Sequence, residues 1–360
     1  MSKNALSNPA AVMSSADRHA IISSKKYKPP KRDLKSLIER NRSSGGYLFK
    51  KAAGNAVFVV LRTALLFGLC FLILQPLLNK FSLSVMSEMD LFDSTVVNIP
   101  REFTLDNYRM TAAPALLDYW PSLFRTFTMS FLIAFLQVAS CTFVAYGFAR
   151  FNFPLKKFWF ACVMGLILIP PQTILSSIYI HFAMFDIFGL FTLIKGSPLS
   201  LLDSPAPYLL MSATCMGLKN GLYIYMIRQY FRGVPKELEE AAYVDGCGKL
   251  KTFLRIMLPD ARAIITSCFL FSFVWQWTDS LFSNLFLRSM NLMSGRVSAI
   301  PESLVSYYHN NFGRDVLPSV AYQQQLVATG MLMFIAPLII LYLIAQKGFV
   351  ESISQSGIKM

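Results

Sequence analysis

The chain has 360 residues, of which 54% are hydrophobic and 15% are charged. A soluble domain of this length carries roughly a quarter charged residues, so the composition excludes an ordinary water-soluble protein and indicates lipid as the solvent. The net charge is +14. Because aromatic residues rarely alternate with the basic ones, this charge favours an anionic membrane surface over nucleic acid as its partner.

Residues 1–52 form a polar segment with twelve lysines and arginines against three acidic residues. The segment has too few apolar residues to build a packed core. We therefore expect a basic, disordered cytoplasmic tail. The first apolar run begins after this tail and lacks a small-residue cleavage site, so we interpret it as a membrane anchor and not as a signal peptide.

Six apolar runs follow, each near the ~20 residues that a helix needs to cross a bilayer. The third run contains Pro170-Pro171, which must bend or break its helix. The sequence predicts an all-α integral membrane protein with six transmembrane helices, in a permease domain over 53–347 and before a cytoplasmic C-terminal tail over 348–360. The predicted spans are 56–78, 123–148, 158–184, 208–227, 264–286 and 326–345.

Charge in the connecting segments orients these spans. The segments after the second and fourth spans are rich in lysine and arginine, whereas the segment after the first is mostly acidic. Positive residues stay on the cytoplasmic side. The protein is therefore predicted to be a multi-pass protein of a cell membrane, with both termini in the cytoplasm and with segments 80–122, 185–207 and 287–320 outside.

The segment 230–262 is too polar to cross a bilayer and carries helix signals. Pro235 suits the first turn of a helix, and the glutamates after it favour the positive end of the helix dipole. Gly246 can adopt a left-handed conformation and end this helix. A second helix is expected beyond it, which Pro259 ends by forcing Leu258 into an extended conformation. The segment predicts a cytoplasmic helix–glycine–helix loop; the alternative is an ordinary amphipathic surface hairpin.

This loop resembles the coupling loop, or EAA motif, of ATP-binding-cassette (ABC) importer permeases. The resemblance is to carbohydrate importers, and within them to the type of the second (G-type) membrane subunit of the maltose transporter. It covers about residues 55–360 and is supported by residues 144–151, by Leu168-Ile169-Pro170 and by the closing segment 346–359. The residues that carry it are Val234-Pro235-Lys236-Glu237-Leu238-Glu239-Glu240-Ala241-Ala242, Asp245-Gly246 and Leu258-Pro259.

The resemblance implies a translocation subunit and not an enzyme. It implies four partners: a homologous permease, a cytoplasmic ATPase dimer, an extracellular solute-binding protein and membrane lipid. The chain's own cluster Gly246-Cys247-Gly248-Lys249 lacks the spacing of a phosphate-binding loop, so ATP is expected to bind the partner, and no cofactor or metal is expected here. The residues that the resemblance implies for coupling to the ATPase are Glu240, Ala241, Ala242, Asp245, Gly246, Ile256, Leu258 and Pro259.

Candidates for the substrate path are polar residues in or near the apolar runs. Asp279 either faces a cavity, or lies at the outer boundary and is hydrated or paired with an arginine. Trp277 and Asp279 together suit a sugar, through ring stacking and hydroxyl hydrogen bonds. Gln172 follows the proline break, and Arg125 either touches solute or faces water. Lys219 either faces a cavity or an acid, or the fourth helix starts after it.

The predicted function is a permease subunit that translocates oligosaccharides or related sugars. A permease for a sugar phosphate or another small polar organic solute is the alternative, and it requires cations along the path. An ion-coupled secondary transporter is the alternative from another class. It requires paired intramembrane acids or an internal repeat, and neither is evident in the sequence.

Overall fold

The computed structural model describes residues 47–93, 95–96, 99–217 and 219–357. Most of the predicted basic tail therefore lies outside the described residues. The chain divides into two units, Met1–Gln75 and Pro76–Met360. The described part of the chain is helical and contains no strand beyond two isolated bridges, Met86 with Phe103 and Phe185 with Leu199.

The described part of the first unit belongs to α3 (Tyr47–Val85), which continues into the second unit. Within this helix, Ala53–Val85 is long and apolar enough to cross a membrane, and none of its most apolar window is buried. Lipid is the solvent that such a surface requires. The first predicted span, 56–78, lies inside this helix.

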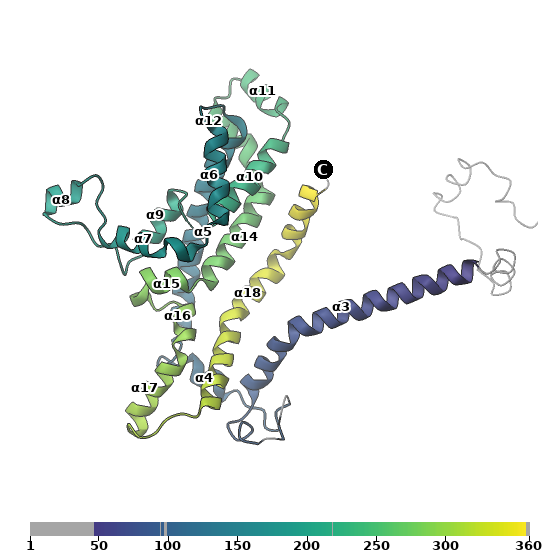
Figure 1. The fold of residues 1–360 in the computed structure, drawn as a ribbon, viewed down its shortest axis with the longest axis vertical. Coiled ribbons are helices and arrows are strands. Elements are labelled where there is room, and N and C mark those ends of the chain that lie inside the picture. Colours follow the sequence, from purple (N-terminus) through teal and green to yellow (C-terminus); the bar gives the residue numbers. More distant parts are fainter. Residues whose placement is uncertain (1–46, 94, 97–98, 218, 358–360) are drawn as a thin grey trace, which may run out of the picture. The chain divides into compact units, whose positions relative to one another are not determined.

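The second unit contains the remaining helices (Figure 1). In chain order they are α4 (Asp106–Ala112), α5 (Tyr119–Arg150), α6 (Lys156–Leu168), α7 (Pro171–Ala183), α8 (Leu190–Lys195), α9 (Ala206–Ala213), α10 (Asn220–Gly233), α11 (Glu237–Val244), α12 (Lys249–Thr252), the π-helical turn η2 (Phe253–Met257), α13 (Leu258–Asp260), α14 (Arg262–Thr278), α15 (Leu281–Phe286), the 3₁₀ turn η3 (Arg288–Met290), α16 (Met293–Ser298), α17 (Ile300–Phe312) and α18 (Val320–Gly357).

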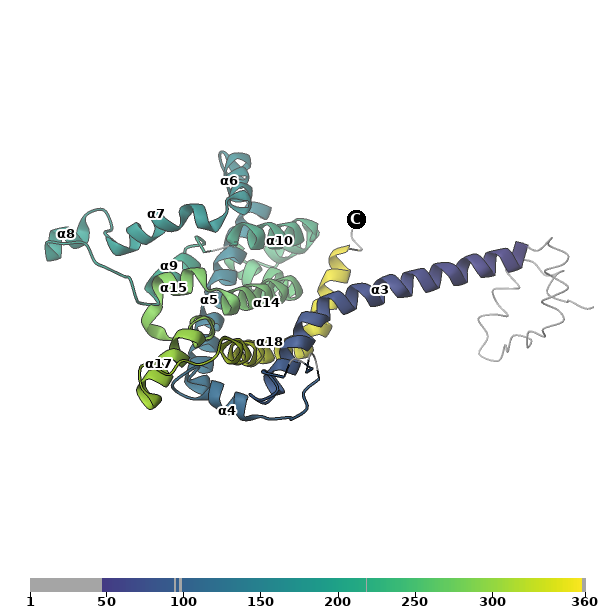
Figure 2. The same ribbon diagram turned by 60° about the horizontal axis from the view of Figure 1, so that its bottom comes forward.

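Helix α5 organises the second unit, because α9, α10 and α14 all pack against it. Helix α10 also packs on α6, and α14 lies between α10 and α18 (Figure 2). One face of α5 is buried by these neighbours, including Ala134, Cys141 and Ala145, each fully buried. Small side chains at these positions let the neighbouring helices approach α5 closely.

Among the described residues, three helices are long and apolar enough to cross a membrane, and up to five spans result if each of two bent helix pairs counts as one. The first bent pair is α6 with α7, which meet at 104°. The predicted break at Pro170-Pro171 is confirmed there: α6 ends at Leu168 and α7 begins at Pro171. The count of six spans stays a prediction.

The fourth predicted span, 208–227, is not one helix. Helix α9 ends at Ala213 and α10 begins at Asn220. Between them Cys215 and Lys219 both have φ of 62°, a left-handed conformation that interrupts the helical hydrogen-bond ladder. The prediction of a continuous helix over 208–227 is therefore wrong. Both alternatives for Lys219 agree with the structure, because α10 starts just after it and its side chain lines a cavity.

Pro259 does not end the second helix of the loop, contrary to the prediction. Leu258 is helical, with φ −68° and ψ −46°, and the chain stays helical through η2 and α13 until it bends at Ala261. Pro259 lies in the first turn of α13, where a missing N–H costs little. Likewise α18 continues to Gly357, so no helix boundary marks the predicted tail at 348.

Candidate functional site

The loop between α10 and α14 begins with α11, which ends in a Schellman motif. The backbone N–H of Gly246 donates to the Tyr243 carbonyl at 3.0 Å, and that of Cys247 donates to the Ala242 carbonyl at 2.9 Å. Gly246 has φ of +76°, the left-handed conformation for which its position selects glycine. The chain then turns into α12, so two helical segments meet at a glycine hinge.

The predicted coupling residues divide into an exposed and an inward-facing set. Ala242 is only 3% exposed and packs into the protein, so its small size serves the chain's own packing. Ile256 and Leu258 are partly buried. The exposed members are Glu240, Ala241, Asp245, Gly246 and Pro259. These five are the ones that a docked protein can reach.

A buried ion pair ties α11 to the end of α5. Arg150 Nε lies 3.3 Å from Glu239 Oε1, with the two side chains 6% and 10% exposed. This contact lacks hydrogen-bond geometry, and Arg150 instead donates through Nη2 to the Val234 carbonyl at 2.7 Å. Tyr146 also donates to Glu239 Oε1, at 3.0 Å. Glu239 was not among the predicted site residues, because it looks like one more acid in a glutamate-rich turn.

Three buried aromatic rings hold the second half of the loop. Phe253 of η2 lies 4.6 Å from Tyr146 of α5 and 6.4 Å from Phe231 of α10, measured between ring centroids. Tyr146 and Phe231 are themselves 5.4 Å apart. These separations are favourable for aromatic pairs. Both halves of the loop are therefore fastened to α5, one by charge and one by ring packing.

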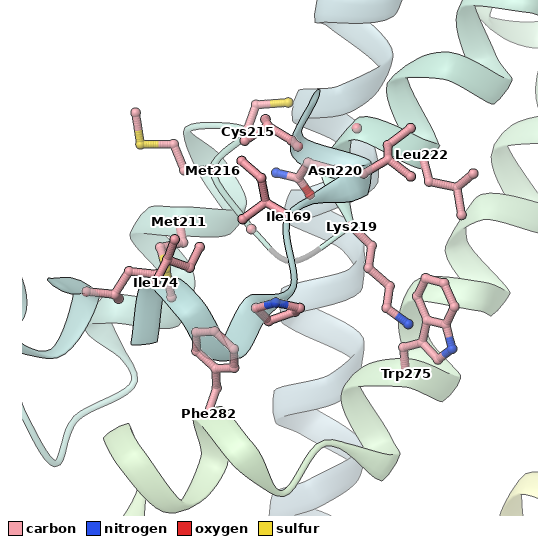
Figure 3. A pocket seen from close by; sticks show the side chains of 16 residues that line it. Ile169, Ile174, Met211, Cys215, Met216, Lys219, Asn220, Leu222, Trp275 and Phe282 are labelled. Carbon is pink, nitrogen blue, oxygen red and sulfur yellow. The ribbon is translucent and has the colours of Figure 1, made fainter. Parts of the chain in front are cut away.

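Two cavities lie beside the break between α9 and α10. The larger, about 490 Å³, is mainly apolar, and the smaller, about 250 Å³, has the more polar lining and is called the polar cavity below. Figure 3 shows Lys219, Trp275 and Phe282 around the larger one. Both cavities share a wall, and the polar one also exposes the side chains of Gln172, Gln276 and Thr278. The residues of the shared wall are Pro171, Lys219, Trp275 and Phe282.

Lys219 extends its side chain to the face of Trp275, where Nζ lies 2.8 Å from the ring centroid (Figure 3). A cation over an indole face is attracted by the ring quadrupole. Lys219 immediately precedes α10 and has a left-handed backbone. The break in the predicted fourth span thus delivers a lysine to the cavity wall.

Asp279 closes the end of α14 and is held by donors from two elements. Tyr208 of α9 donates to its Oδ2, and the Ser283 backbone N–H and hydroxyl donate to the same oxygen at 2.9 and 3.1 Å. The Phe282 N–H lies 3.4 Å from Oδ1. Among the described residues no arginine lies within ion-pair distance of it. Asp279 lines the polar cavity, but its oxygens are largely occupied by the fold.

The other predicted path residues are not gathered at one place. Gln172 is exposed and lines the polar cavity. Trp277 is 1% exposed and donates its indole N–H to the Phe334 carbonyl at 3.2 Å, so it belongs to the core and leaves Trp275 as the tryptophan at the cavities. Arg125 lies 3.3 Å from Asp118 and lines neither cavity.

A string of buried polar side chains crosses three helices and lines the two cavities. Ser272 of α14 donates to the side-chain oxygen of Gln137 on α5, and Gln137 donates to the side-chain oxygen of Asn220 on α10. Such bonds hold membrane helices together. Gln137 and Asn220 therefore join α5, α10 and α14 to one another.

Comparison with known proteins now identifies the family. Residues 139–355 match the model of a family described as "Binding-protein-dependent transport system inner membrane component". The match includes the loop and the cavities. The chain belongs to this family. It is a membrane protein and the permease subunit of an ABC importer, so it is a transport component and not an enzyme.

Curated relatives support this assignment over most of the chain. The arabinooligosaccharides transport system permease protein AraQ of Halalkalibacterium halodurans is 26% identical over 81% of this chain and 93% of that protein. The maltodextrin transport system permease protein MdxG of Bacillus subtilis is 24% identical over 71% and 81%. The sn-glycerol-3-phosphate transport system permease protein UgpE of Salmonella choleraesuis is 24% identical over 82% and 95%.

A solved structure shares the fold. It is a chain of a bacterial ABC transporter involved in the import of the acidic polysaccharide alginate, with a TM-score of 0.61 and 18% identity, covering 82% of this chain and 97% of that one. Family membership decides between the two transporter classes that the sequence left open. The importer permease is shown, and the ion-coupled secondary transporter is set aside.

Proposed function

We propose that this chain translocates sugars in an assembly of two permeases, two copies of a cytoplasmic ATPase and an extracellular solute-binding protein. ATP binding closes the ATPase dimer and moves the α11–α12 loop, which turns the spans from an inward-facing to an outward-facing state. Solute then enters from the binding protein, and hydrolysis resets the state. The cycle is a shift between conformational populations, driven by nucleotide and solute.

The observation that carries the proposal is the loop itself. It presents an exposed glycine hinge and exposed Glu240, Ala241 and Asp245, while Glu239 and Phe253 anchor it to α5. An element that is exposed on one side and rigidly attached on the other transmits force instead of absorbing it. We assign ATPase docking to the exposed side and transmission to the anchored side.

The loop's position agrees with the proposed topology of six spans. Helix α11 and helix α17 lie at opposite ends of the second unit (Figure 1). The basic charge around α11 favours the cytoplasmic side for it, and we assign both chain termini to the same side. Segments 80–122, 185–207 and 287–320 then face outward and are available to the binding protein.

The solute class follows from the relatives and from the cavity. The relatives named above include permeases for arabinooligosaccharides and maltodextrin. Gln172, Gln276 and Thr278 in the polar cavity offer hydrogen bonds suited to sugar hydroxyls. The glycerol-3-phosphate relative keeps a phosphorylated solute as the second candidate.

Substitution at Gly246 tests the coupling role. A Cβ at Gly246 meets nothing within 4 Å, so the first atom of a side chain has room, but any side chain strains the left-handed backbone. We expect Gly246→Trp to leave the permease in the membrane while ATP-driven uptake falls at least tenfold in vesicles containing the whole assembly. Normal uptake by this variant excludes the coupling role.

Two controls separate the possible causes. Gly246→Asn keeps the left-handed conformation that asparagine tolerates, and it adds a small side chain. It is expected to retain more uptake than Gly246→Trp. Gly233→Trp adds the same bulk at another open glycine outside α11 and α12. Equal loss in Gly233→Trp shows that bulk anywhere near the ATPase is harmful and that the hinge has no special role.

A further inference from the structure

The cavity wall carries a cation without a matching anion. Lys219 is the only cationic side chain among the described residues that line the two cavities. No carboxylate in the described part of the chain lies within 4.0 Å of it. Its contact is the Trp275 ring, which attracts the charge but accepts no conventional hydrogen bond. The three N–H donors of the ammonium are therefore free to receive a ligand.

The acid on the same wall does not neutralise Lys219. Asp279 is the only acidic side chain among the described residues lining these cavities, and Tyr208 and Ser283 saturate its Oδ2. It terminates α14 and supports the start of α15, so its orientation is fixed by the fold. The cavity thus presents one positive charge that rests on an aromatic ring and one negative charge that is already hydrogen-bonded.

Lys219 is exposed on the cavity wall, and an ammonium there with no facing carboxylate among the described residues favours a ligand of opposite sign. Hydrogen bonds from an ammonium to a carboxylate or phosphate are roughly twice as strong as neutral ones, and they exceed an exposed cation–π contact. An anion beside Lys219 therefore competes successfully for the ammonium that now rests on Trp275. The neutral groups around it, Gln172, Gln276 and Thr278, remain available for hydroxyls.

We infer that the solute which passes this cavity is a polyhydroxylated molecule bearing an anionic group, either a carboxylate or a phosphate, and that Lys219 is its specificity-determining contact. This inference rests on the proposed permease function and deepens it. The apolar cavity of about 490 Å³ next to the polar one leaves room for the uncharged remainder of the solute. Its volume lies in the range of roughly 300–1,000 Å³ that is typical of small-molecule sites.

The test uses the purified assembly and the fluorescence of Trp275. The assembly is titrated with glycerol 3-phosphate, galacturonate and glucose, and the Trp275 contribution is the difference between wild type and Trp275→Phe. We expect at least one of the two anions to change the Trp275 fluorescence with saturation, because the bound anion draws Lys219 from the ring. Glucose is expected to leave this fluorescence unchanged. A response to glycerol 3-phosphate alone assigns phosphate, and a response to galacturonate alone assigns carboxylate.

Charge variants complete the test. Lys219→Gln is expected to weaken anion binding roughly tenfold or more, whereas Lys219→Arg retains it. Lys195→Gln, a lysine on α8 that lines neither cavity, serves as the matched control and is expected to bind like the wild type. Isothermal calorimetry repeats the titrations without relying on tryptophan.

Three results overturn the inference: an equal response to glucose, unchanged anion binding in Lys219→Gln, or no anion binding by either method. None of these touches the proposed permease function, because the titration requires no nucleotide. The coupling role proposed above fails separately if Gly246→Trp transports normally. If the assembly couples ATP hydrolysis to uptake but binds neither anion, only the Lys219 assignment fails.

Discussion

At the scale of single residues, the contact that distinguishes this loop is the buried pair of Arg150 and Glu239. A buried ion pair adds little net stability compared with apolar residues of the same shape, but removal of one partner leaves an uncompensated charge. Here the pair also joins two elements that must move together if the loop transmits force. Its loss is therefore expected to affect both stability and coupling.

We predict that Arg150→Met lowers the free energy of unfolding by about 3 kcal/mol and reduces the solute transported per ATP hydrolysed. The reason is that Glu239 stays buried without its partner, and α11 is no longer fixed to α5. Thermal unfolding in detergent measures the first effect, and paired uptake and ATPase assays measure the second.

The control for this prediction is Arg109→Met, which removes an exposed ion pair with Asp106 of 3.5 Å and is expected to be nearly neutral. The double variant Arg150→Met with Glu239→Met leaves no buried charge, and it should be more stable than Arg150→Met alone. If the single and double variants unfold at the same temperature, the ion pair does not carry the effect.

Predictions for single residues succeeded where the local sequence determines the conformation. They failed where the role of a residue depends on which face of a helix it occupies. Trp275 and Trp277 lie two positions apart in α14 and so point to different faces of the helix. The sequence does not show which face meets the cavity, and the predicted residue, Trp277, is in the core. The Glu239–Arg150 pair joins positions 89 residues apart, a distance over which sequence pattern carries no signal.

At the scale of elements, α10 is held close to α6 by a glycine. A Cβ at Gly221 would lie 2.7 Å from the Val163 carbonyl oxygen and 2.9 Å from Ile167 Cγ1. A backbone oxygen cannot move aside as the end of a side chain can. The absence of a side chain at Gly221 thus fixes how near the broken fourth span lies to the third, and with it the shape of the cavity wall.

Gly221→Ala is predicted to destabilise the protein by about 1–3 kcal/mol through this overpacking. Gly147→Ala is the matched control, because it lies inside α5 with nothing within 4 Å of the added Cβ, and alanine is the better helix former. Thermal unfolding of the two variants in the same detergent compares them. If Gly221→Ala is as stable as Gly147→Ala, then α6 and α10 can move apart without loss of stability, which contradicts the prediction.

Breaks in the predicted spans were foreseeable only where glycine or proline marks them. Pro170-Pro171 predicts a bend because proline cannot continue a helix. Gly246 predicts a helix end because glycine readily adopts the left-handed conformation found there. The break between α9 and α10 also contains a glycine, Gly217, which is an overlooked signal, whereas the left-handed residues Cys215 and Lys219 are of types that give none. The prediction that Pro259 ends a helix was wrong because a proline is also compatible with the start of a helical turn.

At the scale of the whole molecule, the proposed topology requires the α11–α12 loop and α17 to face opposite sides of the membrane. Both lie in the second unit, at its two ends (Figure 1). The charge pattern of the connecting segments assigns the α11 end to the cytoplasm. A natural thiol marks this end, because Cys247 follows Gly246 and is partly exposed.

We therefore predict that a membrane-impermeant maleimide does not label Cys247 in intact spheroplasts but labels it once the membrane is permeabilised and peripheral proteins are washed away. The exposed thiols on apolar helices, Cys70 and Cys162, are first replaced by serine. The matched probe is Asn311→Cys on exposed α17 in a Cys247→Ala background, which should react in intact spheroplasts. Labelling of Cys247 before permeabilisation inverts the topology, and equal labelling of both probes from one side contradicts the placement of these two ends across the membrane.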